Sequence, residues 1–274
     1  SDWSSDVCSS DLQAGTDVQA EASAGSVVNI RIVNSGRSDF GIAYSGDIFK
    51  ARKGTLRRDR KKYEKVLAVA CFYSAMAQLI VGADSGVTKV WELSGKSVGV
   101  GNMGSGAAAS CELFFTSVGI WHKLQKKFLG YSKAADAFTR GKLDAFWVFT
   151  SIPSPAVRQA ALENKITFVN VYGDAEKIGM FKKHPYFTKT TIPADTYKGV
   201  SWDTPTFQDS SIWIANKKVL AQEVYKLLTL VFSDKGLRYM RQVHPSARDM
   251  SLQNGIRGIV TPLHPGAEKF WKEK

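Results

Sequence analysis

A glycine-rich turn that follows a short apolar strand is the part of this sequence best suited to bind an anion. Gly101, Gly104 and Gly106 let the backbone turn and approach a ligand closely. Ser105 is placed to cap a helix whose first residues are Gly106 and Ala107, and the first amides of a helix point at whatever lies in front of them. The sequence therefore predicts that residues 104–107 hold a carboxylate or phosphate.

The same turn fits a second pattern, the G-x-G-x-x-G of dinucleotide-binding enzymes, through Gly99, Gly101 and Gly104. That pattern expects a further strand about 20 residues on, ending in an acidic residue that holds a ribose. No acidic residue lies between Glu112 and Asp136. A nucleotide-dependent enzyme is therefore the weaker alternative to an anion-binding loop.

Four more residues are candidates for contact with a ligand. Tyr44 and Ser45 end a predicted strand, where they either face a cleft or simply cap the strand end. Trp147 lies near the end of another predicted strand, where one aromatic side chain is expected to line a cleft while its neighbour packs in the core. Tyr197 lies in an irregular segment and is expected either to close over a ligand or to pack at the surface.

Residues for catalysis or metal binding are scattered along the chain. Asp144 has no paired acid, histidine or metal ligand nearby in sequence, so we expect a structural role for it and no enzyme activity. Cys71 and Cys111 are expected to be small buried apolar residues, and no spacing typical of metal ligands occurs. We expect no metal and no cofactor.

Composition favours a globular protein large enough for two domains. The chain has 274 residues, of which 44% are hydrophobic, and no apolar run approaches the ~18 residues of a membrane span. The formal net charge is +12, and residues 50–65 carry nine Lys or Arg against two acidic residues. Such a run indicates a solvated face or a docking patch for an acidic partner or an anionic membrane. Nucleic-acid motifs do not accompany it.

Alternating strand and helix patterns predict an α/β architecture with mainly parallel sheets. Strands are expected at 18–22, 40–44, 66–73, 78–81, 97–101, 143–149, 167–172 and 211–215. Helices are expected at 26–34, 87–93, 134–140, after Pro153, at 219–231 and at 235–243. The spacing suggests two lobes, with 13–94 and 201–274 in the first and 95–200 in the second.

Several motifs resemble the TAXI family of solute-binding proteins of TRAP transporters. They are residues 25–29, 34–43, 93–98, 104–106, 141–146, 152–157, 192–199 and 262–270. The resemblance runs from about residue 13 to the C-terminus. It implies a two-lobed periplasmic binding protein fold of type II that closes by a hinge on a small carboxylate such as glutamate or a dicarboxylate. Ala107 stands where that family more often has a hydroxyl residue.

The N-terminal region departs from that family. The family's first strand, glycine-rich loop and first helix are missing, and residues 1–12 resemble translated adapter sequence, so we treat them as non-native. In the family, the missing strand lies between the second and third strands of the first lobe. We therefore expect two unpaired strand edges, lower stability than in the parent protein, and weak ligand binding.

The functional expectation is an extracytoplasmic solute receptor that delivers its ligand to the membrane subunits of a TRAP transporter. A binding protein of an ABC importer is the first alternative, and a nucleotide-dependent enzyme or a nucleic-acid binder follows. Periplasmic localisation is implied by the family resemblance alone. In this sequence no basic start followed by an apolar stretch marks a signal peptide. We expect a monomer.

Overall fold

The computed structural model describes residues 19–21, 23, 25–56, 59–103, 105–243 and 245–274. The chain divides into two compact units, the first made of residues 1–73 and 210–274 and the second of residues 74–209. Two long strands, β2 (Val66–Gly82) and β8 (Thr204–Asn216), contribute residues to both units. The predicted non-native residues 1–12 and both end residues of the strand expected at 18–22 lie outside the described part, and residues 19–21 are not in a strand.

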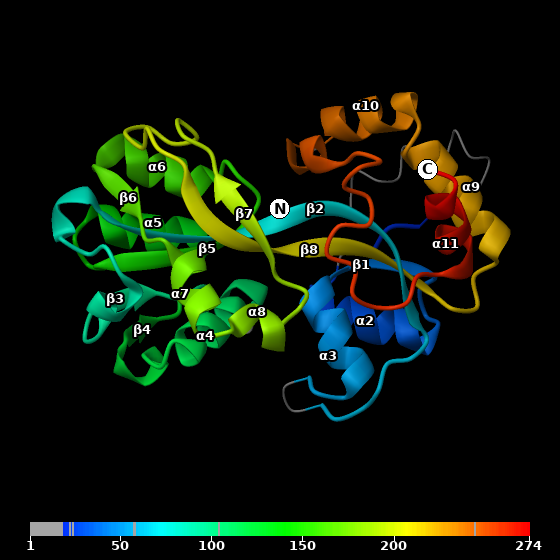
Figure 1. The fold of residues 1–274 in the computed structure, drawn as a ribbon, viewed down its shortest axis with the longest axis horizontal. Helices are drawn as coiled ribbons and strands as arrows, with labels where there is room; N and C mark the ends of the chain where they lie inside the picture. Colours follow the sequence, from blue (N-terminus) through cyan, green and yellow to red (C-terminus); the bar gives the residue numbers. More distant parts are fainter. Residues whose placement is uncertain (1–18, 22, 24, 57–58, 104, 244) are drawn as a thin grey trace. The chain divides into compact units, whose positions relative to one another are not determined.

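In its described residues the first unit combines three strand segments with five α-helices, and their course can be followed in Figure 1. Besides parts of β2 and β8, it contains β1 (Phe40–Tyr44), α2 (Ser26–Ser35), α3 (Ser45–Lys53), α9 (Ala221–Val231), α10 (Asp234–Val243) and α11 (Pro265–Lys272). A 3₁₀ helix, η5 (Pro245–Asp249), precedes the final loop. Strand β8 pairs antiparallel with β1, placing Phe40 opposite Ala215 and Tyr44 opposite Ser211.

The strand order in this unit is β1-β8-β2. The sequence analysis expected two unpaired strand edges where the missing first strand would lie. Among the described residues β1 stands at one end of the strand order and pairs with β8 alone, so this expectation stays a prediction. The other edge of β2 bonds to the C-terminal segment, where Ala68 N donates to Pro262 O at 3.0 Å and His264 N donates to Ala68 O at 2.8 Å. Backbone groups of β2 are thus used on both sides.

Helices cover both faces of the first unit's strands. Ile30 and Val33 of α2 pack with Ile48 of α3 and with Ile212 of β8 in one buried cluster. Val224 and Leu228 of α9, Phe270 of α11 and Val69 of β2 belong to another. Because β2 is covered on both faces, its sequence is apolar almost throughout instead of alternating.

The second unit has a mixed sheet. Its elements are β3 (Ser97–Gly99), β4 (Gln125–Lys127), β5 (Ala145–Thr150), β6 (Ile166–Phe168), β7 (Thr188–Ile192), α4 (Gly106–Ser117), α5 (Tyr131–Thr139), α6 (Pro155–Glu163), α7 (Val171–Lys177) and α8 (Met180–Lys183). Short 3₁₀ helices, η2 (Ala83–Ser85), η3 (Val90–Leu93) and η4 (Trp121–Lys123), lie between them.

Most strand pairs with a defined register are antiparallel, so the expectation of mainly parallel sheets is wrong. Strand β3 pairs parallel with β4 and β5. The pairs β2/β5, β2/β6, β7/β8 and β1/β8 are antiparallel. The physical reason is that two long strands enter the sheet against the direction of their neighbours, which a local strand and helix pattern does not reveal.

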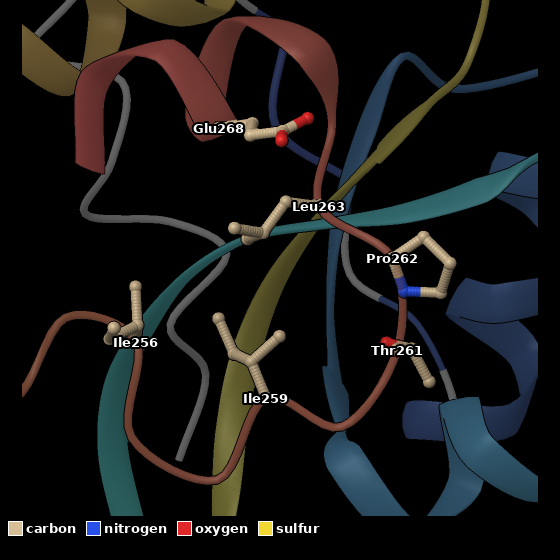
Figure 2. A pocket seen from close by; sticks show the side chains of 6 residues that line it. All are labelled: Ile256, Ile259, Thr261, Pro262, Leu263 and Glu268. Carbon is tan, nitrogen blue, oxygen red and sulfur yellow. The ribbon is translucent and has the colours of Figure 1, made fainter. Parts of the chain in front are cut away.

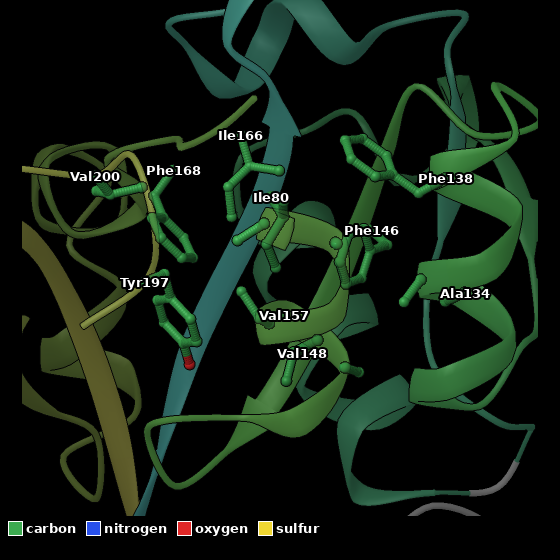
Figure 3. Packing of buried hydrophobic residues seen from close by; sticks show 14 of the residues in the cluster. Ile80, Ala134, Phe138, Phe146, Val148, Val157, Ile166, Phe168, Tyr197 and Val200 are labelled. Atoms are coloured by element: carbon green, nitrogen blue, oxygen red, sulfur yellow. The ribbon is translucent and has the colours of Figure 1, made fainter. Parts of the chain in front are cut away.

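Alternate side chains of β5 enter two different cores. Phe146 and Val148 pack against α5 and α6, together with Ile80 and Phe138 (Figure 3). Trp147 points to the other face, where its ring stacks on Phe114 of α4 with centroids 5.4 Å apart. The period of two along a strand thus fixes α5 and α6 on one face of β5 and α4 on the other.

The boundary between the units differs from the predicted lobe boundary. The structure divides the chain at 73/74 and 209/210, whereas the sequence pattern suggested 94/95 and 200/201. Strand β2 is the reason, because it is one strand of 17 residues where the sequence suggested two apolar runs. Strand β8 likewise begins seven residues before the predicted 211–215. The assignment of two functional lobes stays a proposal.

Candidate functional site

The start of α4 is built as the sequence predicts. Ser105 is the N-cap, with an extended backbone, and its hydroxyl accepts a hydrogen bond from Ala108 N at 3.1 Å. The same hydroxyl donates to Asn102 O at 2.7 Å, and Ala109 N donates to Ser105 O at 3.0 Å. The predicted cap is confirmed. The Ser105 hydroxyl thus already donates one hydrogen bond and accepts another within the loop and the first turn of α4.

Two amides at this helix start have no partner among the described residues. They belong to Gly106 and Ala107, the first two residues of α4, which no intrahelical carbonyl can reach. Gly106 is exposed, whereas the Ala107 side chain is buried. The helix dipole adds positive potential at this end, and two amide donors in this position suit an anion, whose binding here stays a prediction. Gly104, predicted as part of the same site, lies outside the described residues.

Gly101 brings the loop against the helix. Its φ of +93° belongs to the left-handed region, and a Cβ there would lie 2.9 Å from Ala108 N and 3.1 Å from Ala107 Cβ. A side chain at this position would therefore collide with the first turn of α4. The glycine that the sequence singled out is needed for this close approach.

Trp147 lies beneath α4 and is buried, with 1% of its surface exposed. Its indole N–H donates to Ser110 Oγ at 3.1 Å, one turn into the helix. Phe149, two residues further along β5, is also buried and stacks near Trp147 at 6.4 Å between centroids. The two aromatic residues thus share one core, and Trp147 supports the helix from inside instead of being open to a ligand.

Tyr197 is also in a core, with 2% of its surface exposed. Its hydroxyl donates to Gln78 Oε1 at 2.6 Å and accepts from Ser154 N at 2.8 Å. Burial raises the pKa of the Tyr197 phenol well above its ordinary value. The hydroxyl therefore ties the loop between β5 and α6 to strand β2. Within this unit the Tyr197 side chain is buried, whereas the sequence analysis expected it at the surface or closing over a ligand.

Gln78 and Ser154 are the residues of this network that the sequence analysis missed. Gln78 is completely buried in the apolar stretch of β2, and Ser154 is the N-cap residue of α6. A single amide side chain within an apolar strand requires a buried partner, because an unpaired amide in a core is strongly destabilising. The position of Gln78 within an apolar run was therefore the sequence feature that could have indicated a buried hydrogen-bond network.

The predicted residues of the first unit lie where β1 meets α3. Tyr44 is half-buried, and its backbone N–H donates to Ser26 Oγ at 3.0 Å. Ser45 is buried, and its hydroxyl donates to Gly258 O at 2.5 Å. The structure brings these two together with the loop that contains Gly258. The Ser45 hydroxyl holds that loop, whereas the Tyr44 amide is bonded to the start of α2.

A half-buried ion pair lies in and beside this loop. Arg257 forms an ion pair with Asp249, which also accepts from Asn254 Nδ2 at 3.3 Å. Burial raises the pKa of the nearby Cys71 thiol to about 11, although the positive charge of Arg257 opposes the rise. Burial also raises the pKa of Cys111. Both thiols are therefore buried and protonated, which confirms the sequence prediction for them.

Asp144 is a structural residue, as predicted. Its Oδ2 accepts from Ser97 N at 2.8 Å and from Ser97 Oγ at 2.7 Å, which joins the start of β5 to β3. Lys96 Nζ lies 3.8 Å from its other oxygen. Partial burial opposes ionisation, but the hydrogen bonds from Ser97 outweigh it and lower the pKa of Asp144.

A cavity of about 450 Å³ lies in the first unit (Figure 2). Its lining residues include neither Tyr44 nor Ser45, although Ser45 bonds to Gly258, which directly precedes the lining residue Ile259. Its walls are Ile256, Ile259, Thr261, Pro262, Leu263 and Glu268. Figure 2 shows Glu268 on α11 and the other five on the segment before it. The charged group here is a carboxylate, paired with Lys272 Nζ at 2.7 Å, so the cavity is unsuited to an anion.

Comparisons with known proteins give a family and several similar structures. The sequence model of the NMT1-like family matches residues 5–274. The periplasmic aliphatic sulphonate binding protein SsuA from Escherichia coli is 14% identical, covers 96% of this chain and 76% of its own, and has a TM-score of 0.48. A substrate binding protein of an amino acid ABC transporter is 13% identical; the match covers 85% of this chain and 79% of that protein, with a TM-score of 0.43. The GluR0 ligand binding core in complex with L-glutamate is 12% identical; the match covers 89% of this chain and 86% of that protein, with a TM-score of 0.48.

Within the described residues, none of the helices has both the length and the apolar character that crossing a membrane requires.

Proposed function

The chain belongs to the NMT1-like family, and from this membership we propose that it is a solute-binding protein that captures a small anionic molecule at the start of α4. The observation that carries the proposal is the pair of unpartnered amides of Gly106 and Ala107 at a capped helix start. Backbone amides at such a position suit a carboxylate, a sulfonate or a phosphate. The buried Trp147 supports helix α4 from inside, the buried Tyr197 ties the loop before α6 to β2, and both are left out of the proposed contact surface.

Two transporter classes are candidates for the partner. An ABC importer is our first choice, and the similar structures include a substrate binding protein of an amino acid ABC transporter. The TRAP-type permease implied by the TAXI resemblance is the second choice. Periplasmic localisation and capture by hinged closure are parts of the proposal that rest on the same resemblance.

A ligand panel tests the class of function. Glutamate, 2-oxoglutarate and an alkanesulfonate should raise the melting temperature in proportion to RT ln(1 + [L]/Kd), whereas a neutral diamide of the same length should not. NAD serves as the test of the enzyme alternative. Stabilisation by NAD together with no response to any of the anions would reject the proposal.

A proline at the first helical position tests the site itself. Gly106→Pro removes the amide N–H, yet proline suits the first residue of a helix, and the extended Ser105 (φ −78°, ψ 158°) is compatible with a following proline. Gly106→Ala is the matched control because it keeps the N–H. A hydrogen bond to a charged group contributes about 1.5–3 kcal/mol, so we expect binding at least about tenfold weaker in the proline variant than in the alanine variant.

The melting temperatures of the two ligand-free variants should be similar. Equal affinity of both variants for the anion that stabilises the wild-type chain would place the anion elsewhere.

A further inference from the structure

The first unit carries a group of exposed cations that its own fold does not use. They are Arg60, Lys61, Lys62, Lys65 and Lys217, which we call the basic surface. Among the described residues, none of the five side chains forms an ion pair or a hydrogen bond. Their charges are therefore available to a partner outside the chain.

Backbone contacts hold these residues in one region. Lys217 N donates to Lys65 O at 2.8 Å, so that two lysines distant in sequence lie side by side. The backbone of Arg60 lies against Gly54, where a Cβ would be 2.7 Å from Arg60 O. Tyr63 N donates to Ala51 O at 3.1 Å, which holds residues 60–63 against the end of α3.

Neighbouring cations, in contrast, have local partners. Arg31 pairs with Asp59 at 2.8 Å, and Lys218 lies 3.3 Å from Asp39. Arg52 donates to Val66 O at 2.9 Å. These three cations therefore have a structural role within the unit, and two of them neutralise nearby carboxylates. Within residues 59–65, Glu64 is then the acidic side chain left exposed and without an ion pair in the described part.

The character of the basic surface favours a lipid surface over a protein partner. None of the large exposed apolar side chains of the described chain falls within residues 59–65 or at 217. Cores of protein interfaces are enriched in aromatic residues and methionine and depleted of lysine. Anionic phospholipid head groups attract lysine and arginine without needing an apolar anchor. We propose that the basic surface binds the surface of an anionic phospholipid membrane.

Vesicle sedimentation of the full chain tests this proposal. The wild-type chain should sediment at low salt with vesicles of equal parts phosphatidylcholine and phosphatidylglycerol, and not with phosphatidylcholine alone. At about 1 M salt, where the screening length is about 3 Å, sedimentation should be lost. Each cation contributes about fivefold to the partition coefficient, so the triple variant Lys61→Glu, Lys62→Glu, Lys65→Glu should bind at least about 100-fold more weakly.

The matched control is the triple variant Lys142→Glu, Lys165→Glu, Lys198→Glu, which removes the same charge from exposed lysines of the second unit. It should retain far more of the vesicle binding. Equal loss in both variants would mean diffuse attraction by net charge and would overturn the proposal. So would equal sedimentation with neutral vesicles, or binding that appears only when the vesicles contain a membrane protein.

Circular dichroism melts establish that both triple variants are folded. The measurement is independent of the anion site at α4, since the Gly106→Pro variant should bind vesicles like the wild type. Failure of the vesicle experiment therefore leaves the proposed solute-binding function untouched, and failure of the ligand panel leaves the membrane proposal untouched.

Discussion

Replacing Tyr197 by phenylalanine separates support of the site from contact with a ligand. The hydroxyl accepts from Ser154 N and donates to Gln78 Oε1, and both partners are buried. Phenylalanine keeps the ring and its packing, so the loss falls on these two hydrogen bonds. A buried polar group left without its partner destabilises the folded protein by about 1–3 kcal/mol, so the two partners together predict a loss of about 2–6 kcal/mol.

Urea unfolding of the ligand-free chain measures this loss as a lower midpoint at an unchanged slope. Tyr172→Phe is the matched control, because its hydroxyl makes an exposed bond to Glu176 Oε1 at 2.6 Å. Its free energy of unfolding should stay within about 0.5 kcal/mol of the wild type. The double variant Tyr197→Phe, Gln78→Met should recover part of the stability, since it removes the orphaned acceptor as well.

One result would refute this reasoning. If Tyr197→Phe unfolds like the wild type but is no longer stabilised by the anion, the hydroxyl contacts the ligand and not the buried network. The sequence expectation of a ligand-facing Tyr197 would then hold.

Two further predictions concern titratable side chains. Asp144→Ala should lower the free energy of unfolding by about 1 kcal/mol through loss of its bonds to Ser97, and should leave the anion-induced thermal shift intact; a lost thermal shift would contradict its structural role. Burial lowers the pKa of His264, whose Nδ1 accepts from Gly266 N at 3.3 Å, so the folded state binds fewer protons than the unfolded state. Stability should therefore be complete above about pH 6.5 and fall below it by up to about 1.4 kcal/mol per pH unit, a fall that urea titrations of His264→Gln should not show.

Local patterns predicted those elements that end on strong sequence features. The helix expected at 26–34 is α2, and its end is fixed by Gly36, whose φ of +81° favours glycine. The strand expected at 40–44 is β1. By contrast, β4 and β7 were missed because their residues are mostly lysine, glutamine and threonine, without an apolar alternation. Helix α3 was missed as well, since its last turn is dominated by basic residues.

The candidate site was predictable only where its geometry is local. Ser105 and the helix that it caps depend on neighbours within a few residues, and the sequence placed them correctly. The positions of Trp147 and Tyr197 depend on which face of a strand is covered and on a residue more than 100 positions away. Such burial follows from tertiary packing, which a single sequence does not display.

The first unit draws its strands from both ends of the chain, and this has a consequence for the order of folding during synthesis. Phe40 of β1 pairs with Ala215 of β8, so the early segment leaves the ribosome long before its partner exists. The second unit is one continuous stretch and is complete once residue 209 has emerged. It can therefore fold first, while the nascent β1 segment remains exposed to chaperones until its β8 partner has been synthesised.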